Sequence, residues 1–159
     1  FMALAVASTD ETESKPPAPT ARTPLGSPAT CGAVEVTIRE VKNGSSVSGL
    51  LEDHKPSEGG IYVMVDWAYK NTSKKPLGMM DRPSLSIVSE DGVEYEEDIG
   101  AASSYAAEND DDEKILSDLN PGLTSRSSAL FEVSKELFNE ETWSIKVTCD
   151  DAEQWFKMK

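Results

Sequence analysis

The stretch that decides the fold is IYVMVDWAYK, which occupies residues 61–70. Its large apolar side chains recur at every second position, and these are Ile61, Val63, Val65, Trp67 and Tyr69. Side chains that alternate in this way lie on one face of a β-strand, so a strand is predicted here with an apolar face turned to a core. Tyr62 and Met64 stand between them, which indicates that the centre of the strand is buried on both faces.

Shorter stretches on both sides of this strand show the same period of two. They are residues 34–38, 85–88, 93–95, 129–133 and 143–149. Turn sequences separate them, among them Asp91-Gly92, which is typical of a β-hairpin, and Asn120-Pro121-Gly122. Several short strands with turns between them predict an all-β domain built as a two-sheet β-sandwich. One helical turn is expected at residues 135–139.

The acidic balance of the chain limits its partners. The formal net charge is −14 at pH 7, and residues 31–159 carry 13 basic and 26 acidic side chains. Such a surface repels the phosphates of nucleic acids and of anionic lipids, so neither partner is expected. The charge either keeps the domain soluble or steers a cationic partner toward it. No apolar run approaches the ~20 residues of a transmembrane helix, so no membrane-spanning segment is expected.

The N-terminal residues differ in composition from the rest. Residues 1–7 are apolar, and Ala5-Val6-Ala7 before Ser8 has the form of a signal-peptidase site, so they are either a signal remnant or a stretch introduced by cloning. Residues 8–30 are rich in Pro, Ser, Thr and Ala, which predicts a disordered tether. We therefore expect a remnant or tag plus linker at residues 1–30 and the β-sandwich at residues 31–159, in an exported protein.

Several short motifs occur in an order that resembles a bacterial family. Val65-Asp66-x-x-x-x-Asn71 ends the long strand, and Asp91-Gly92-x-x-Tyr95 follows the next one. Leu119-Asn120-Pro121-Gly122 then precedes a serine-rich strand with Phe131-Glu132-Val133. The chain thus resembles the immunoglobulin-like domain of bacterial secreted proteins and lipoproteins, whose distant relatives include a secreted mycobacterial immunoprotective antigen. The resemblance implies an immunoglobulin-like sandwich and export, but no enzymatic activity and no ligand residues. It also implies a lipid-anchoring cysteine, a role that we do not expect for Cys31, because no apolar segment precedes it.

Cys31 and Cys149 lie near the two ends of the predicted domain. Their spacing matches no zinc motif, so we predict a disulfide and an oxidising compartment. Two considerations oppose the bridge. Cys31 is out of phase with the strand at residues 34–38, a slip that a bulge at Gly32 would absorb. First and last strands that run parallel would also place the cysteines about 20 Å apart at ~3.3 Å per residue. The bridge therefore requires the chain to enter the domain near the end of the last strand.

A catalytic site is not expected in this sequence. His54 is the only histidine, and it stands in a polar loop before Gly59-Gly60. Neither a Gly-x-Ser-x-Gly turn nor a phosphate-binding glycine-rich loop accompanies it. We therefore expect a solvated loop histidine, no enzyme and no cofactor.

Two segments are candidate binding sites. Residues 108–113 include Asp110, Asp111 and Asp112, which are hard oxygen ligands of the kind that calcium binds, but the glycine of a calcium-binding loop is missing. The alternative for this run is a solvated loop. Trp155-Phe156 stands in a charged C-terminal segment, where the pair either folds back onto the domain or contacts a partner.

The sequence as a whole favours a non-catalytic extracellular binding module. We expect a monomer whose ligand is a protein or another component of the envelope. The linker permits its tethering to the cell surface. The alternatives are a structural spacer of an envelope protein and a calcium-binding module that uses residues 108–113.

Overall fold

The structure is a computed structural model, and it describes residues 21–45, 55–98 and 118–159. These residues form eight strands and a short 3-10 helix. In chain order the elements are β1 (Pro28–Cys31), β2 (Val34–Gly44), β3 (Gly60–Asn71), η1 (Met79–Asp81), β4 (Ser84–Val88), β5 (Glu94–Tyr95), β6 (Thr124–Ser134), β7 (Ser144–Cys149) and β8 (Ala152–Lys157).

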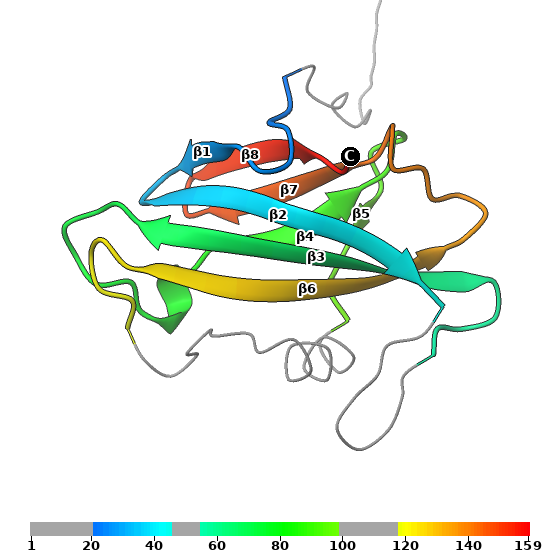
Figure 1. Cartoon of the computed structure of the whole chain (residues 1–159), viewed down its shortest axis with the longest axis horizontal. Helices are drawn as coiled ribbons and strands as arrows, with labels where there is room; N and C mark the ends of the chain where they lie inside the picture. Colours follow the sequence, from blue (N-terminus) through cyan, green and yellow to red (C-terminus); the bar gives the residue numbers. More distant parts are fainter. Residues whose placement is uncertain (1–20, 46–54, 99–117) are drawn as a thin grey trace, which may run out of the picture.

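The strands form two sheets that face each other (Figure 1). One sheet has the order β1-β2-β3-β6 and the other the order β5-β4-β7-β8. All neighbouring strands within the sheets run antiparallel. The predicted all-β, two-sheet β-sandwich is therefore confirmed. Within the described residues, no helix has the length and apolar character that crossing a membrane would require.

β3 contains the stretch at residues 61–70 and lies in the interior of its sheet, between β2 and β6. Val63, Val65 and Trp67 belong to the core between the two sheets. Tyr62 and Met64 point to the opposite face, and they are also buried. The prediction that the centre of this strand is buried on both faces is confirmed.

The first strand begins a few residues before Cys31, the residue at which the sequence predicted the start of the domain. β1 already starts at Pro28 and pairs with β2. Before it, the N–H of Thr23 donates to the carbonyl of Trp155, and the carbonyl of Thr23 accepts from the N–H of Lys157, both over 2.9 Å. These are backbone hydrogen bonds, which a composition rich in Pro, Ser and Thr does not reveal.

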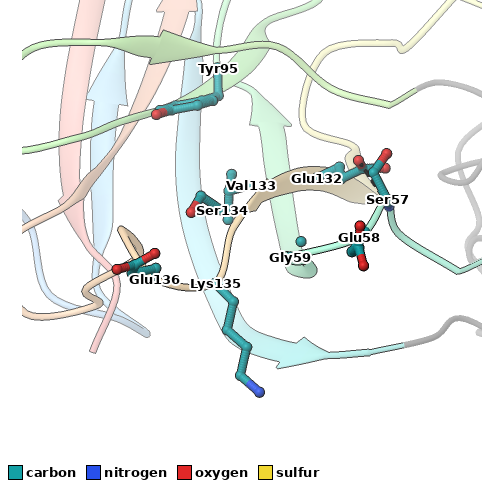
Figure 2. A pocket seen from close by; sticks show the side chains of 10 residues that line it. Ser57, Glu58, Gly59, Tyr95, Glu132, Val133, Ser134, Lys135 and Glu136 are labelled. Carbon is teal, nitrogen blue, oxygen red and sulfur yellow. Dashed lines mark hydrogen bonds between the residues drawn. The ribbon is translucent and has the colours of Figure 1, made fainter.

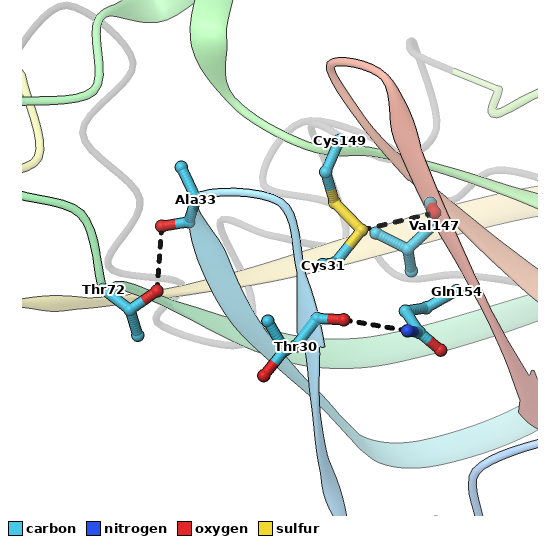
Figure 3. Close-up of a disulfide and its surroundings, with 7 residues drawn as sticks. All are labelled: Thr30, Cys31, Ala33, Thr72, Val147, Cys149 and Gln154. Carbon is cyan, nitrogen blue, oxygen red and sulfur yellow. Dashed lines mark hydrogen bonds between the residues drawn. A yellow bond between two sulfur atoms is a disulfide. The ribbon is translucent and has the colours of Figure 1, made fainter.

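A disulfide joins Cys31, at the end of β1, to Cys149, at the end of β7 (Figure 3). The Cα atoms are 5.8 Å apart, and 118 positions separate the two residues in the sequence. β1 forms a hairpin with β2, so the chain reaches Cys31 before it reverses into the next strand. The predicted obstacle of parallel first and last strands therefore does not arise, and the bridge ties one sheet to the other.

The hairpin between β1 and β2 depends on Gly32. Its φ is +59°, and a Cβ atom built on it would lie 3.1 Å from the carbonyl oxygen of Cys149. Gly32 thus serves as a turn residue in a close approach of two backbones, instead of the bulge that was predicted.

We expect Gly32→Ala to lower the free energy of unfolding by about 2 kcal/mol, because the left-handed conformation alone costs roughly 1–2 kcal/mol for an L-residue. Gly26→Ala is the matched control, since Gly26 also has a positive φ but nothing within 4 Å of its added Cβ. Urea unfolding of both variants measures the difference. Equal losses at the two positions would show that the approach to Cys149 is not tight.

The buried side chain of Asn71 holds two loops at the end of β3. Its Nδ2 donates to the carbonyls of Lys75 and Leu119, over 2.7 and 2.8 Å. Its Oδ1 accepts from the N–H and the Oγ of Ser73, over 2.9 and 2.7 Å. The side-chain amide thus uses both of its hydrogens and both lone pairs of its oxygen.

The segment after Cys149 is a strand, β8, which was not predicted. It pairs with β7 through a tight turn in which Asp150 has a φ of 53°. The expected helical turn at residues 135–139 is a hydrogen-bonded turn, in which the N–H of Phe138 donates to the carbonyl of Ser134 over 3.0 Å.

Candidate functional site

A pocket of about 780 Å³ opens at the end of the sandwich where β3 begins and β6 ends (Figure 2). β5 is an edge strand of one sheet and β6 an edge strand of the other, and residues of both line the pocket. The lining residues are Ser57, Glu58, Gly59, Gly60, Tyr95, Glu132, Val133, Ser134, Lys135 and Glu136. Its volume lies within the range of known ligand pockets, ~300–1,000 Å³.

A tight turn before β3 forms one wall of the pocket. Gly59 has a φ of +81°, and the N–H of Gly60 donates to the carbonyl of Ser57 over 2.9 Å. The N–H of Lys135 donates to the carbonyl of Gly59 over 3.0 Å, which fixes this turn against the end of β6. The N–H of Ser57 in turn donates to Oε2 of Glu132 over 3.2 Å, so the carboxylate of Glu132 is held at the wall.

Tyr95 forms the opposite wall and belongs to an aromatic cluster whose other members lie behind it. The ring of Tyr95 stacks on the buried ring of Trp143, with 5.1 Å between centroids and 15° between planes. Phe138 contacts Trp143 edge-on, at 5.3 Å between centroids. The core therefore fixes the position of Tyr95 while the tyrosine itself stays half-buried at the pocket.

Carboxylates dominate the electrostatics at this end of the molecule. Glu58, Glu132 and Glu136 line the pocket against a single cation, Lys135. The pKa of the neighbouring Tyr62 phenol is raised, first by burial and then by the negative charges of Asp98 and Glu132. This end of the sandwich is therefore a region of negative potential.

A second hollow, of about 450 Å³, lies on the outer face of the sheet that contains β2, β3 and β6. Its charged lining residues are Arg39, Glu40, Lys42, Asp66 and Arg126. Lys42 lies 3.6 Å from Glu40, and the Oγ of Ser128 donates to Asp66 over 3.0 Å. Cations and carboxylates are interspersed here, so the hollow has no dominant charge to select a ligand.

The predicted partner-binding pair, Trp155 and Phe156, divides between the two faces of β8. Phe156 is fully buried in the core, so this residue folds back onto the domain, the first of the two alternatives, and is not available to a partner. Trp155 lies on the outer face, half-exposed, with Nζ of Lys146 at 5.9 Å from the centre of its ring. Alternation along a strand separates adjacent residues in this way, and because β8 was not predicted, the sequence treated the two residues as one pair.

The other predicted sites are placed as follows. Cys31 and Cys149 form the disulfide described above. The proposed calcium ligands Asp110, Asp111 and Asp112 lie outside the described residues, and so does His54. In the part of the chain that the structure describes, no three His, Cys, Asp or Glu side chains gather to hold a metal ion.

The residues of the pocket were not identified from the sequence. Glu58, Tyr95 and Glu136 come from three segments that are distant in the chain, and only the meeting of β5 with β6 brings them together. One local signal exists, because six of the nine residues at positions 90–98 are acidic and surround Tyr95. An aromatic side chain within an acidic run is a recognisable feature, although it does not reveal the pocket by itself.

Comparison with known proteins places the chain among bacterial domains. A family model described as a domain of unknown function, DUF4352, matches residues 23–144. The uncharacterized protein YxkC of Bacillus subtilis is 40% identical over 117 residues, which span 73% of this chain and 65% of that protein. The chain thus corresponds to a little under two thirds of that relative's length.

Solved structures share the fold. A conserved hypothetical protein from Bacillus anthracis has a TM-score of 0.70 at 25% identity, over 85% of this chain and 95% of that one. A β-sandwich protein from Clostridium difficile has a TM-score of 0.56 at 16% identity, over 95% of this chain and 100% of that one. YcdA of Bacillus subtilis, which its description assigns provisionally to the lipoproteins, has a TM-score of 0.55 at 16% identity, over 86% of this chain and 38% of YcdA.

Proposed function

The chain belongs to the DUF4352 family, and from this premise we propose that it is an exported, non-catalytic binding module whose ligand occupies the pocket between β5 and β6. The pocket itself carries the proposal. It has the volume of a ligand site, and the turn at Gly59 and the stacked pair Tyr95–Trp143 preform its walls. Preformed walls reduce the entropy that ordering a site on binding would cost.

The chemistry of the pocket supports binding without catalysis. The described residues that line it include neither histidine nor cysteine, the side chains that most often transfer protons or attack substrates near neutral pH. Its carboxylates belong to residues with exposed or half-exposed side chains. Such carboxylates suit the recognition of a ligand.

Export is supported by the disulfide between Cys31 and Cys149, because such bonds persist mainly in oxidising compartments. The likeness to YcdA agrees with a place in the bacterial envelope. Kinship with the mycobacterial antigen stays a prediction from the sequence motifs.

Binding to isolated cell envelopes of Bacillus subtilis tests the proposal, since YxkC of that organism is a relative. We expect saturable binding of the labelled domain, and at least a tenfold loss in Ser57→Trp, which places a bulky ring at the wall of the pocket without changing the charge. Thr124→Trp is the matched control, because Thr124 is exposed at the opposite end of β6. Absence of saturable binding, or equal binding by Ser57→Trp, would overturn the proposal.

A further inference from the structure

We propose that the pocket receives a cationic side chain, lysine or arginine, from an extended basic segment of a protein partner. This inference rests on the proposed binding function and adds the chemistry of the ligand. Three features of the pocket support it: the placement of its carboxylates, the exposed face of Tyr95, and an apolar surface between them that fits an alkyl stem.

The carboxylates are distributed around the pocket. Figure 2 shows Glu132 and Glu58 on one side and Glu136 on the other, while the amine of Lys135 extends away from Tyr95 and from these carboxylates. The hydrogen bond from the N–H of Ser57 holds Glu132 in place. The cation among the lining residues therefore does not neutralise the centre of the pocket, and a ligand cation gains the attraction of all three carboxylates.

Tyr95 adds a second element of cation recognition. Trp143 covers one face of its ring by stacking at 15°, and the tyrosine contributes to the lining of the pocket. A cation within about 6 Å of the ring centre is attracted to the negative face of an aromatic ring. Because Trp143 is buried, Tyr95 cannot easily turn away from this position.

The mouth of the pocket favours a long side chain over a buried small molecule. Glu58, Lys135 and Glu136 are exposed, so the pocket opens to solvent, while the half-buried ring of Tyr95 provides apolar surface. Lysine and arginine place an alkyl stem on such a surface and a charged head at its rim. The net charge of −14 in addition attracts a basic segment from a distance.

The ligand is tested with the peptide acetyl-Gly-Lys-Lys-Gly-amide, titrated into the full chain and followed by NMR. The same peptide with acetylated lysines is the control, because it keeps the backbone and the alkyl stems but carries no positive charge. We expect the lysine peptide to shift the resonances of Gly59, Gly60 and Tyr95, and the acetylated peptide to bind at least tenfold more weakly. Equal binding of the two peptides, or shifts that avoid the pocket, would overturn the inference.

Variants separate the pocket from the general acidity of the protein. Glu58→Gln/Glu136→Gln should raise the dissociation constant of the lysine peptide by about five- to tenfold, the effect of losing two exposed charge pairs. Glu35→Gln/Glu153→Gln removes the same charge at the other end of the sandwich, near Cys31 and Cys149, and should change it less than twofold. Equal effects of the two double variants would mean that the attraction is non-specific and would refute the inference.

The outcomes for the ligand and for the proposed function are distinguishable. If Ser57→Trp abolishes envelope binding and the lysine peptide does not compete for it, the cationic ligand is refuted while the binding function stands. If the domain shows no saturable envelope binding, the proposed function fails irrespective of the peptide. Competition by the lysine peptide, but not by its acetylated form, is the result we expect.

Discussion

The double variant Cys31→Ala/Cys149→Ala is expected to lose about 4–5 kcal/mol of unfolding free energy, as the chain-entropy treatment gives for a loop of this size. The bridge spans 118 positions and joins the two sheets, so its removal frees almost the whole domain in the unfolded state. Small domains have only about 5–15 kcal/mol in total, so the loss leaves a marginal fold. Urea unfolding monitored by the fluorescence of the buried Trp143 measures it.

Reduction of the unmodified chain is the control for this prediction. It opens the loop without deleting a side chain, so it should reproduce most of the loss seen in the double variant. The corner around the bridge also contains the hydrogen bond from Nε2 of Gln154 to the carbonyl of Thr30, 2.8 Å, visible in Figure 3. A loss below about 1 kcal/mol in both experiments would show that such contacts hold the corner without the bridge.

Asn71→Asp is expected to lower the free energy of unfolding by about 3–4 kcal/mol, although the two side chains have almost the same volume. Nδ2 of Asn71 donates to the carbonyls of Lys75 and Leu119, and a carboxylate cannot donate to either. Both carbonyls keep another donor, the N–H of Leu77 at Leu119 and the Oγ of Ser73 at Lys75, so most of the cost comes from the new buried charge, which is placed against the two carbonyl oxygens. Asn120→Asp, at an exposed position of the neighbouring turn, is the matched control and should stay within about 0.5 kcal/mol.

The loss in Asn71→Asp should also depend on pH. Burial next to carbonyl oxygens raises the pKa of the introduced carboxyl above its value in the unfolded chain. The unfolded state therefore releases this proton first as the pH rises, and the variant is destabilised increasingly above a pH of about 4. Urea unfolding at pH 4 and pH 7 tests this. The difference in unfolding free energy between the variant and the unmodified chain should be smaller at pH 4. An equal difference at both pH values would mean that the introduced carboxyl is solvated.

Asn71 shows that two of the sequence motifs contact each other in the structure. The sequence links this asparagine to the end of the long strand and Leu119 to a later turn. The structure shows that the first donates a hydrogen bond to the carbonyl of the second, and that the N–H of Asn71 donates to the carbonyl of Leu123 over 2.9 Å. The order of the motifs thus reflects one packed corner, which the separate turn signals do not reveal.

The sequence by itself determined the type of each main strand and therefore the architecture. Alternation at residues 61–70 and at residues 129–133 is a local property of the chain, because neighbouring side chains in a strand point to opposite faces. The hairpin at Asp91-Gly92 is local for the same reason, and β4 and β5 pair across it as predicted. The double burial of β3 follows from its nearly continuous run of apolar side chains.

Only the tertiary structure decided which distant segments meet. The start of the domain depends on backbone bonds between Thr23 and β8, and backbone groups are the same in every residue, so composition does not encode their partners. The approach of Cys31 to Cys149 depends on the hairpin of β1 with β2, and the pocket depends on the meeting of two sheet edges at Tyr95. These contacts join positions far apart in the chain, and their geometry is fixed by the packing of one sheet on the other.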